Sequence, residues 1–469
     1  MINLSLIDIA QQVNGTLQGN DLIITNVSTD TREISADSLF IALVGPNFNG
    51  HVFANEARQN GAVAMIASEP VEAHMPVIMV EDTKAALGAL GAYVKQKVAP
   101  KTVGITGSSG KTTVKEMTTA ILKECGSVLS TQGNFNNDIG VPLTLLRLEA
   151  EHEYAVIEMG ANHIGEIAYT TGLVKPDVAT IVNAAASHLE GFGSLFGVAR
   201  AKSEIFKGLS KSGTAILNYD SQFYDFWLGK LDNELIYSFS LNSAPGKGAD
   251  YSASQVGLAF NGCAHFIMHT PIGEMNIELT LPGIHNVGNA LLAAALSINV
   301  GASLENVRDG LAKIQHVKGR LEVKQLSEKV RLLDDSYNAN VASVTAAIKL
   351  LSSYEGRRVL VLGDMAELGD QARHYHEQVG ELAKSESIEM FYTLGELSKS
   401  ASDMFGEGGQ HFSHIEPLLD ALYKELYAND NEFTILVKGS RSSRMDRVVT
   451  AIEGAPLSNV QHYGGFTEC

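Results

Sequence analysis

The chain has few cysteines and a shortage of positive charge. Its 469 residues include three cysteines, which stand far apart and show no spacing typical of a metal site or a disulfide framework. The 35 Lys and Arg residues are outnumbered by 53 Asp and Glu residues, which gives a formal net charge of −18. Such an acidic balance argues against nucleic acid or an anionic membrane as a partner. An anionic ligand must therefore be held by local cations, helix ends or metal.

The chain also lacks long apolar runs. It leads from Met1 into an amphipathic segment, with neither a cleavable signal nor a stretch long enough to span a membrane. The scattered cysteines suit a reducing compartment, so we expect a cytoplasmic protein. We further expect a monomer that binds small molecules, with no nucleic acid partner and no membrane insertion.

The order of apolar and polar segments predicts three α/β domains, because the chain is too long for one ordinary core. Residues 1–82 form a small N-terminal domain. Residues 83–316 alternate strands and helices, which is typical of a mostly parallel sheet, and residues 230–282 interrupt this rhythm with predicted antiparallel hairpins. Residues 317–469 form a second, Rossmann-like α/β series without a phosphate loop.

A glycine-rich loop in the central domain predicts a nucleotide site. Thr102–Ile105 is an apolar strand, Gly107–Gly110 a tight loop, and Lys111 opens a helical pattern. Backbone N–H groups of small residues can surround phosphate oxygens, Lys111 can reach the outer phosphates and Thr112 can bind Mg²⁺. Ile105 stands where the general phosphate-loop pattern has its first glycine, so a turn without ligand is the alternative. Lysine and threonine directly after the last glycine favour nucleotide binding.

Three ionisable residues after the glycine-rich loop are candidates for the same site. Glu158 ends an apolar strand, where it could hold Mg²⁺ against phosphates or simply be solvated. His188 follows the next strand, and a lone histidine is more often a satisfied polar residue than a ligand. Lys202 lies on the predicted helix Ser194–Leu209, where the alternative is a surface lysine paired with Glu204.

Asparagines gather at two places. Asn134, Asn136 and Asn137 lie in one polar loop, where they could form turns or offer amide groups to a polar substrate. Asn286 and Asn289 are three residues apart at a predicted helix start, so they share one face unless one of them is the N-cap.

A polar loop of the N-terminal domain carries Ser28, Asp30 and Arg32 directly after a predicted strand. Ligands commonly lie at such strand ends. Taken alone, Asp30 and Arg32 equally fit an ordinary turn with a surface ion pair.

Together these segments resemble the Mur ligases, which add amino acids to the peptide of the bacterial cell-wall precursor. The resemblance extends over essentially the whole chain. Its motifs, in the order and rough spacing of that family, are Thr106–Thr112, Glu158, His188, Lys202, Gly283–Asn286 with Asn289, and Gly319-Arg320. Three further segments are similar to the member that acts last in the series: Gly133–Asn137, Asp335–Asn340 and Gly363–Gly369.

The resemblance implies a role for each of these residues. The ATP-binding residues would be Thr106, Gly107, Ser108, Ser109, Gly110, Lys111, Thr112, Thr113, Asn286, Asn289, Arg320 and Asp335. The residues that bind the UDP-linked substrate would be Ser28, Asp30, Arg32, Asn134, Asn136 and Asn137. Mg²⁺ would be held by Thr112, Glu158, His188 and Lys202, with Lys202 converted by CO₂ to a carbamate. Catalysis would rest on Lys111, Glu158, His188, Lys202 and Arg320, and Lys438–Arg441 would help to receive the second substrate.

The implied reaction is ATP-dependent amide formation. The terminal carboxylate of a UDP-linked muramyl tripeptide becomes an acyl phosphate, which the amine of D-alanyl-D-alanine attacks. Alternatives are a folylpolyglutamate synthase-like ligase, a phosphate-loop kinase and a nucleotide-regulated binding protein. The N-terminal domain and the Asn134–Asn137 loop argue against the first. The third residue of the tripeptide stays open.

Overall fold

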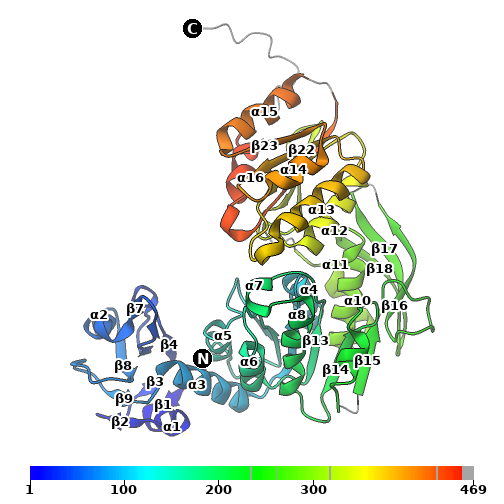
Figure 1. Cartoon of the computed structure of the whole chain (residues 1–469). Helices are drawn as coiled ribbons and strands as arrows, with labels where there is room; N and C mark the ends of the chain where they lie inside the picture. Colours follow the sequence, from blue (N-terminus) through cyan, green and yellow to red (C-terminus); the bar gives the residue numbers. More distant parts are fainter. Residues whose placement is uncertain (233–234, 260, 316–317, 429–430, 457–469) are drawn as a thin grey trace, which may run out of the picture.

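The protein folds into three α/β units, each built around its own sheet, and the central unit contacts both of the others (Figure 1). The computed structural model describes residues 1–232, 235–259, 261–315, 318–428 and 431–456. The predicted boundary between residues 316 and 317 lies outside the described residues, so our division at 82 and 316 stays a prediction. None of the helices in the described ranges combines the length and apolar character needed to cross a membrane.

The N-terminal unit has a five-stranded sheet with a buried central strand. The strands, in spatial order, are β2 (Thr16–Gln18), β9 (Val77–Met79), β8 (Ala62–Ala67), β5 (Ser38–Ile41) and β4 (Asn26–Ser28). All neighbours pair in parallel except β2 with β9. The remaining elements are β1 (Leu4–Ser5) with β3 (Ile23–Ile24), β6 (Val44–Gly45) with β7 (Phe48–Asn49), α1 (Leu6–Gln12) and α2 (Ala54–Gln59). The Ser28–Arg32 loop leaves the carboxyl end of β4.

The central unit is organised around a six-stranded parallel sheet. Its strands, in spatial order, are β11 (Val128–Ser130), β12 (Tyr154–Glu158), β10 (Lys101–Thr106), β13 (Val178–Ile181), β14 (Thr214–Asn218) and β15 (Leu235–Phe239). The phosphate-loop strand β10 is thus central, between β12 and β13. In register, Ile105 stands beside Glu158 and Thr106 beside Ile181. The carboxyl ends of three strands therefore meet at one edge.

Helices cover both faces of this sheet, because apolar side chains point alternately to either side of each strand. On β12, Ala155 and Ile157 pack into one core, and Val156 packs into the core on the other face. The helices are α3 (Thr83–Val98), α4 (Lys111–Lys123), α5 (Gly140–Leu146), α6 (Glu166–Val174), α7 (Leu189–Phe192), α8 (Leu195–Lys202), α9 (Tyr224–Leu228), α10 (His285–Ile298) and α11 (Leu304–Ala312). Helices α4, α10 and α11 share the second core with a three-stranded antiparallel sheet of β16 (Ser252–Leu258), β17 (Cys263–Thr270) and β18 (Gly273–Pro282).

Two element predictions are corrected in this unit. The hairpins predicted for 230–282 begin later than expected, because Leu235–Phe239 joins the parallel sheet as β15. The helix predicted for Ser194–Leu209 ends at Lys202 and continues as a 3₁₀ turn over Ser203–Gly208. The tighter turn brings the carboxylate of Glu204 to backbone N–H groups at the start of α6.

The C-terminal unit has a second six-stranded sheet without a phosphate loop. Its strands are β19 (Glu322–Gln325), β20 (Val330–Asp335), β24 (Phe433–Lys438), β21 (Arg357–Gly363), β22 (Met390–Leu394) and β23 (Gly409–Phe412), in that order. Only β19 runs antiparallel to its neighbour among these pairs. The helices are α12 (Val341–Ser352), α13 (Ala372–Ser385), α14 (Lys399–Phe405), α15 (Ile415–Ala428) and α16 (Asp446–Glu453). The ends of β20 and β24 face the central unit's nucleotide edge.

Candidate active site

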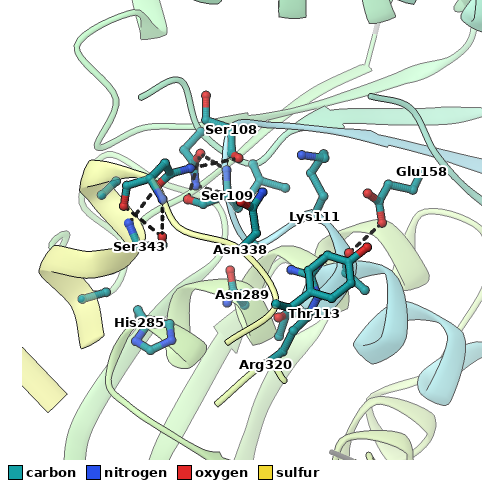
Figure 2. A pocket seen from close by; sticks show the side chains of 18 of the residues that line it. Ser108, Ser109, Lys111, Thr113, Glu158, His285, Asn289, Arg320, Asn338 and Ser343 are labelled. Carbon is teal, nitrogen blue, oxygen red and sulfur yellow. Dashed lines mark hydrogen bonds between the residues drawn. The ribbon is translucent and has the colours of Figure 1, made fainter. Parts of the chain in front are cut away.

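A cavity of about 680 Å³ lies between the carboxyl edge of the central sheet and the C-terminal unit (Figure 2). It brings together most of the predicted site residues from segments far apart in the chain. Those that line it are Ser108, Ser109, Gly110, Lys111, Thr112, Thr113, Asn134, Asn136, Asn137, Glu158, His188, Lys202, Asn286, Asn289, Arg320 and Asp335. Thr106, which ends β10, and Gly107, which begins the loop, do not line the cavity, and Ser28, Asp30 and Arg32 belong to the N-terminal unit outside it.

The glycine loop has the form of a phosphate cradle. Gly110, which precedes α4, has a φ of 76°, a left-handed conformation that favours glycine over residues with a Cβ atom. Asn183, after β13, fixes the loop by accepting hydrogen bonds from the backbone N–H groups of Ser108 (3.0 Å) and Ser109 (3.0 Å). The ammonium of Lys111 donates to the carbonyl of Gly107 at 2.8 Å. Burial lowers the pKa of Lys111, and the Glu158 carboxylate opposes that shift.

Oxygen donors for a hard cation stand beside this loop. The hydroxyl of Thr112 donates to Oε2 of Glu158 at 2.9 Å, and Glu158 is 2% exposed. The amide of Asn136 donates to Oε1 of the same carboxylate at 2.8 Å. Asn137 instead forms the turn that leads into α5, because its Oδ1 accepts from Gly140 N at 2.8 Å, while Ile139 is the N-cap of the helix. The asparagine loop therefore forms a turn, which was one of the two roles that its sequence allowed, and contact of its amides with a substrate stays a prediction.

Lys202 is a buried cation with no anion beside it. It is 1% exposed, lines the cavity, and forms no hydrogen bond or ion pair with any residue that the structure describes. Its ammonium lies 5.9 Å from the ring centroid of Phe192. Burial lowers the pKa of Lys202 well below its usual range, and the nearby Lys111 lowers it further. The alternative of a surface lysine paired with Glu204 is wrong, because that carboxylate binds α6 backbone N–H groups and approaches Lys207.

His188 meets the C-terminal unit at the rim of the cavity. Its Nδ1 atom contacts the carboxylate of Glu367, and the N–H of Leu189 donates to the carbonyl of Glu367 at 2.9 Å. His188 beside it lowers the pKa of the Glu367 carboxyl. Both His188 and Glu367 have positive φ values, 53° and 62°. A second contact between the units joins the amide of Asn340 to the carbonyl of Ser108 at 3.3 Å, so the two units touch at two places beside the cavity.

The asparagine pair lies on the first turns of α10. Asn289 donates to Oδ1 of Asn286 at 2.8 Å, and Asn286 donates to the carbonyl of Pro282 at 2.7 Å. Neither is the N-cap, a position taken by Ile284. The two amides therefore share a face, as the spacing predicted.

His285, at the start of α10, is neutral in the folded protein near pH 7. Burial lowers its pKa from 6.5 to about 4, and the cation of Lys438 contributes. Because the unfolded chain binds the proton more readily, this residue's contribution to stability is present above pH 6.5 and is lost as pH falls toward 4. We expect His285→Gln to reduce the acid loss of unfolding free energy by about 1 to 2 kcal/mol between pH 7 and pH 5. Urea unfolding of both proteins at each pH measures the difference, and an equal acid loss in both would contradict it.

The C-terminal unit contributes a buried ion pair to the cavity. The ammonium of Lys438, 2% exposed, donates to Oδ2 of Asp335 at 2.5 Å and to the carbonyl of Asn338 at 2.9 Å. Burial raises the pKa of Asp335, and Lys438 opposes the shift. Within the predicted Lys438–Arg441 segment, Lys438 thus holds Asp335 in place.

The predicted uridine-nucleotide loop lies at the carboxyl edge of the N-terminal sheet. Arg32 donates from Nε to Oδ1 of Asp30 at 2.9 Å and from Nη2 to Oδ2 at 2.5 Å. The side chain of Arg32 is 84% exposed, and Ser28 Oγ accepts from the N–H of Asp30 at 3.1 Å. The surface ion pair that the sequence allowed is therefore formed, with the guanidinium open to solvent.

Sequence reasoning missed several residues of the cavity. Asn183 follows strand β13 and is visible as a polar residue at a strand end, whereas Tyr337 and Asn340 belong to the Asp335–Asn340 segment, which the resemblance singled out without giving these two residues a role. Glu367 belongs to a motif that the resemblance singled out without a role, and its contact with His188 depends on how two units dock.

A parallel strand, a glycine loop, a helix N-terminus and an acid on the neighbouring strand together define a phosphate-loop nucleotide site, which a second α/β unit closes. Comparison with known proteins gives the family. The Mur ligase middle domain matches residues 105–297, the Mur ligase glutamate ligase domain residues 319–441, and the catalytic domain of the Mur ligase family residues 23–95. The chain belongs to the Mur ligase family.

Individual members of the family are similar to this chain over nearly their whole length. The chain is 48% identical over 453 residues to the UDP-N-acetylmuramoyl-tripeptide–D-alanyl-D-alanine ligase of Escherichia coli (strain K12), which covers 97% of this chain and 99% of that protein. A crystal structure of MurF from Acinetobacter baumannii is 35% identical, with a TM-score of 0.90 and coverage of 96% and 98%. MurF ligase from Thermotoga maritima in complex with ADP is 26% identical, with a TM-score of 0.80 and coverage of 91% and 97%.

Proposed function

We propose that this ligase joins D-alanyl-D-alanine to a UDP-N-acetylmuramoyl-tripeptide, with ATP as the energy source, in the synthesis of the peptidoglycan precursor. The observation that carries the proposal is that the phosphate loop, Glu158, Lys202 and Arg320 line the same cavity. The similarity to relatives of that name over 97% of the chain supports the choice of substrates.

The chain's own residues suit phosphoryl transfer to a carboxylate. Lys111 stands at the helix start where the outer phosphates of ATP would lie, and Arg320 enters from the other unit. Two cations there offset the charge that develops as the tripeptide carboxylate takes the phosphoryl group. The contacts of Asn340 and Glu367 with the central unit hold the C-terminal unit against the cavity, where it would limit the access of water to an acyl phosphate. The dipeptide amine then attacks the acyl carbon and phosphate leaves.

The residues present fit Mg²⁺. The hydroxyl of Thr112 and the buried carboxylate of Glu158 are 2.9 Å apart, and both are the hard oxygen donors that Mg²⁺ prefers. The described residues contain no cluster of three or more His, Cys, Asp or Glu side chains suited to a metal. Further ligands would therefore come from His188, from Lys202 as a carbamate and from phosphate oxygens. When bound, the ion would neutralise phosphate charge and orient the transferred group.

Lys202 is suited to carbamate formation. The neutral amine attacks the carbon of CO₂, a C–N bond forms, and the displaced proton passes to solvent. A lowered pKa raises the neutral fraction, and a buried site without an acid partner leaves the ammonium form unstabilised. The product is an anionic oxygen donor on a long arm, which replaces a repulsive cation beside the metal.

In this proposal the N-terminal unit binds the UDP part of the substrate, and Ser28, Asp30 and Arg32 are the residues that contact it. We expect Arg32→Ala to weaken binding of the UDP-linked substrate about tenfold or more while ATP affinity stays within twofold, because a charged hydrogen-bond donor to that substrate is lost. Arg58→Ala, an exposed arginine on α2 of the same unit, is the matched control. Calorimetric titration of each ligand measures both constants. Equal weakening of the two ligands, or of neither, would overturn the assignment.

Dependence on both substrates tests the proposed function. ADP release should require the UDP-linked tripeptide and D-alanyl-D-alanine together, with the ligated pentapeptide detected by mass spectrometry. A panel of tripeptides with lysine or diaminopimelate in third position then identifies the preferred substrate. ADP formation without an amide product would indicate a kinase, and slow release that neither substrate accelerates would indicate a nucleotide-regulated binding protein.

A further inference from the structure

An aromatic ring holds the arginine that enters the cavity from the C-terminal unit. The guanidinium carbon of Arg320 lies 4.3 Å from the ring centroid of Tyr337, within the range of a cation–π contact. The guanidinium of Arg441 lies 5.4 Å from the same centroid. Tyr337 follows β20 by two residues and lines the cavity together with Arg320.

The backbone joins the same two segments. The N–H of Tyr337 donates to the carbonyl of Gly319 at 3.0 Å. Gly319 has a φ of 70°, and a Cβ atom there would lie 3.3 Å from both the Cβ and the N of Tyr337. The turn that carries Arg320 is therefore shaped against Tyr337, and only a residue that tolerates a left-handed backbone and a close neighbour fits it.

The guanidinium of Arg320 has no other fixed partner in the part of the chain that the structure describes. It forms no hydrogen bond or ion pair there, although it lies close enough to Lys111 and to Asp335 to lower the pKa of each by its charge, against the upward effect of burial on Asp335. The Asp335 carboxylate attracts the guanidinium only through space, and a long side chain with several rotatable bonds and no hydrogen-bonded anion would still sample many directions. The ring of Tyr337 restricts the Arg320 side chain and keeps it close to the second cation, Lys111.

We propose that Tyr337 is a positioning residue that orients Arg320 toward the transferred phosphoryl group. This inference rests on the proposed function, because it assigns the guanidinium to the charge that develops during carboxylate activation. The ring acts through its face and not through its hydroxyl, since the contact to Arg320 is made over the ring. The ring also spans the turn at Gly319 and the segment of Arg441, so the arginine is in place only when the C-terminal unit is correctly packed.

The test compares ring and side-chain substitutions. Tyr337→Phe keeps the ring and should retain kcat within about twofold, whereas Tyr337→Leu should lower kcat about tenfold, with a change in ATP dissociation constant below threefold. Tyr337→Met provides a second ringless variant if the leucine variant is less stable. Tyr375→Leu, the same change on α13 away from the cavity, is the matched control. Thermal unfolding of each variant checks that the fold is kept.

A double-mutant cycle separates positioning from a general structural effect. In an Arg320→Ala background, Tyr337→Leu should cause little further loss of kcat, because the group that the ring orients is already absent. Additive losses, an unchanged kcat in the ringless variants, or an equal loss in Tyr337→Phe would each overturn the proposal. Failure of the proposed function would show instead as absence of amide product in the unmodified enzyme, so the two failures are distinguishable.

Discussion

Lys111→Ala should lower the rate of ATP-dependent ligation about 1,000-fold while the protein stays folded. Lys111 opens α4, its ammonium donates to the carbonyl of Gly107, and it lines the cavity beside Thr112 and Glu158. Lys111 is half-buried, and among the described residues no acid lies at hydrogen-bond distance from its ammonium, so phosphate is the anion that it is placed to meet. Alanine removes that charge and leaves the loop backbone unchanged.

A lysine on the same helix provides the control for this prediction. Lys123 lies in the last turn of α4 and is exposed, so Lys123→Ala should keep full activity. Steady-state assays of product formation and circular dichroism of both variants make the comparison. If Lys111→Ala turns over at a rate near that of Lys123→Ala, the phosphate loop does not serve catalysis as assigned.

Lys202→Ala should lose about 100-fold or more in rate, and added formate or acetate should restore part of it. The residue is buried in the cavity without an acid partner, and its low pKa favours the amine form that reacts with CO₂. A small carboxylate can enter the space left by the side chain and supply the oxygen donors that the proposed carbamate would provide. Lys202→Glu carries a carboxylate on a shorter arm, so its activity should be weak at best.

The control for the Lys202 prediction is a solvent-exposed lysine in the 3₁₀ turn that follows α8. Lys207, 65% exposed in its side chain, approaches only Glu204 among the described residues, so Lys207→Ala should retain its activity and respond to neither formate nor acetate. Rates of all variants are measured with and without the added carboxylate. A fully active Lys202→Ala, or a mass spectrum of the substrate-bound native protein without the CO₂ adduct, would contradict the assignment.

Local patterns in the sequence predicted the central sheet well and its edge poorly. Strands β10, β12 and β13 are continuous apolar runs because both faces are buried. Strand β15 at the edge is exposed at Leu235 and half-buried at the next two positions, so it lacks the fully buried apolar run of the central strands. The pattern therefore could not distinguish a parallel edge strand from the antiparallel segments that follow it.

The same distinction between local and long-range features applies to the candidate site. The glycine loop and Glu158 could be derived from the residues, since the loop is local and the acid ends a strand that pairs with β10. Arg320 and Asp335 were placed in the cavity only by resemblance, because they arrive from another unit. The Glu367 contact and the Tyr337 ring escaped prediction, since both depend on the docking of surfaces that no local pattern records.

Transfer of a carboxylate oxygen tests the central claim most directly. The UDP-linked tripeptide is prepared with ¹⁸O in both oxygens of its terminal carboxylate and incubated with ATP, Mg²⁺, D-alanyl-D-alanine and the enzyme. Activation through an acyl phosphate predicts one ¹⁸O atom in the released phosphate for each amide bond formed, with the other retained in the peptide. Unlabelled phosphate, whose fourth oxygen then comes from water, would contradict the account.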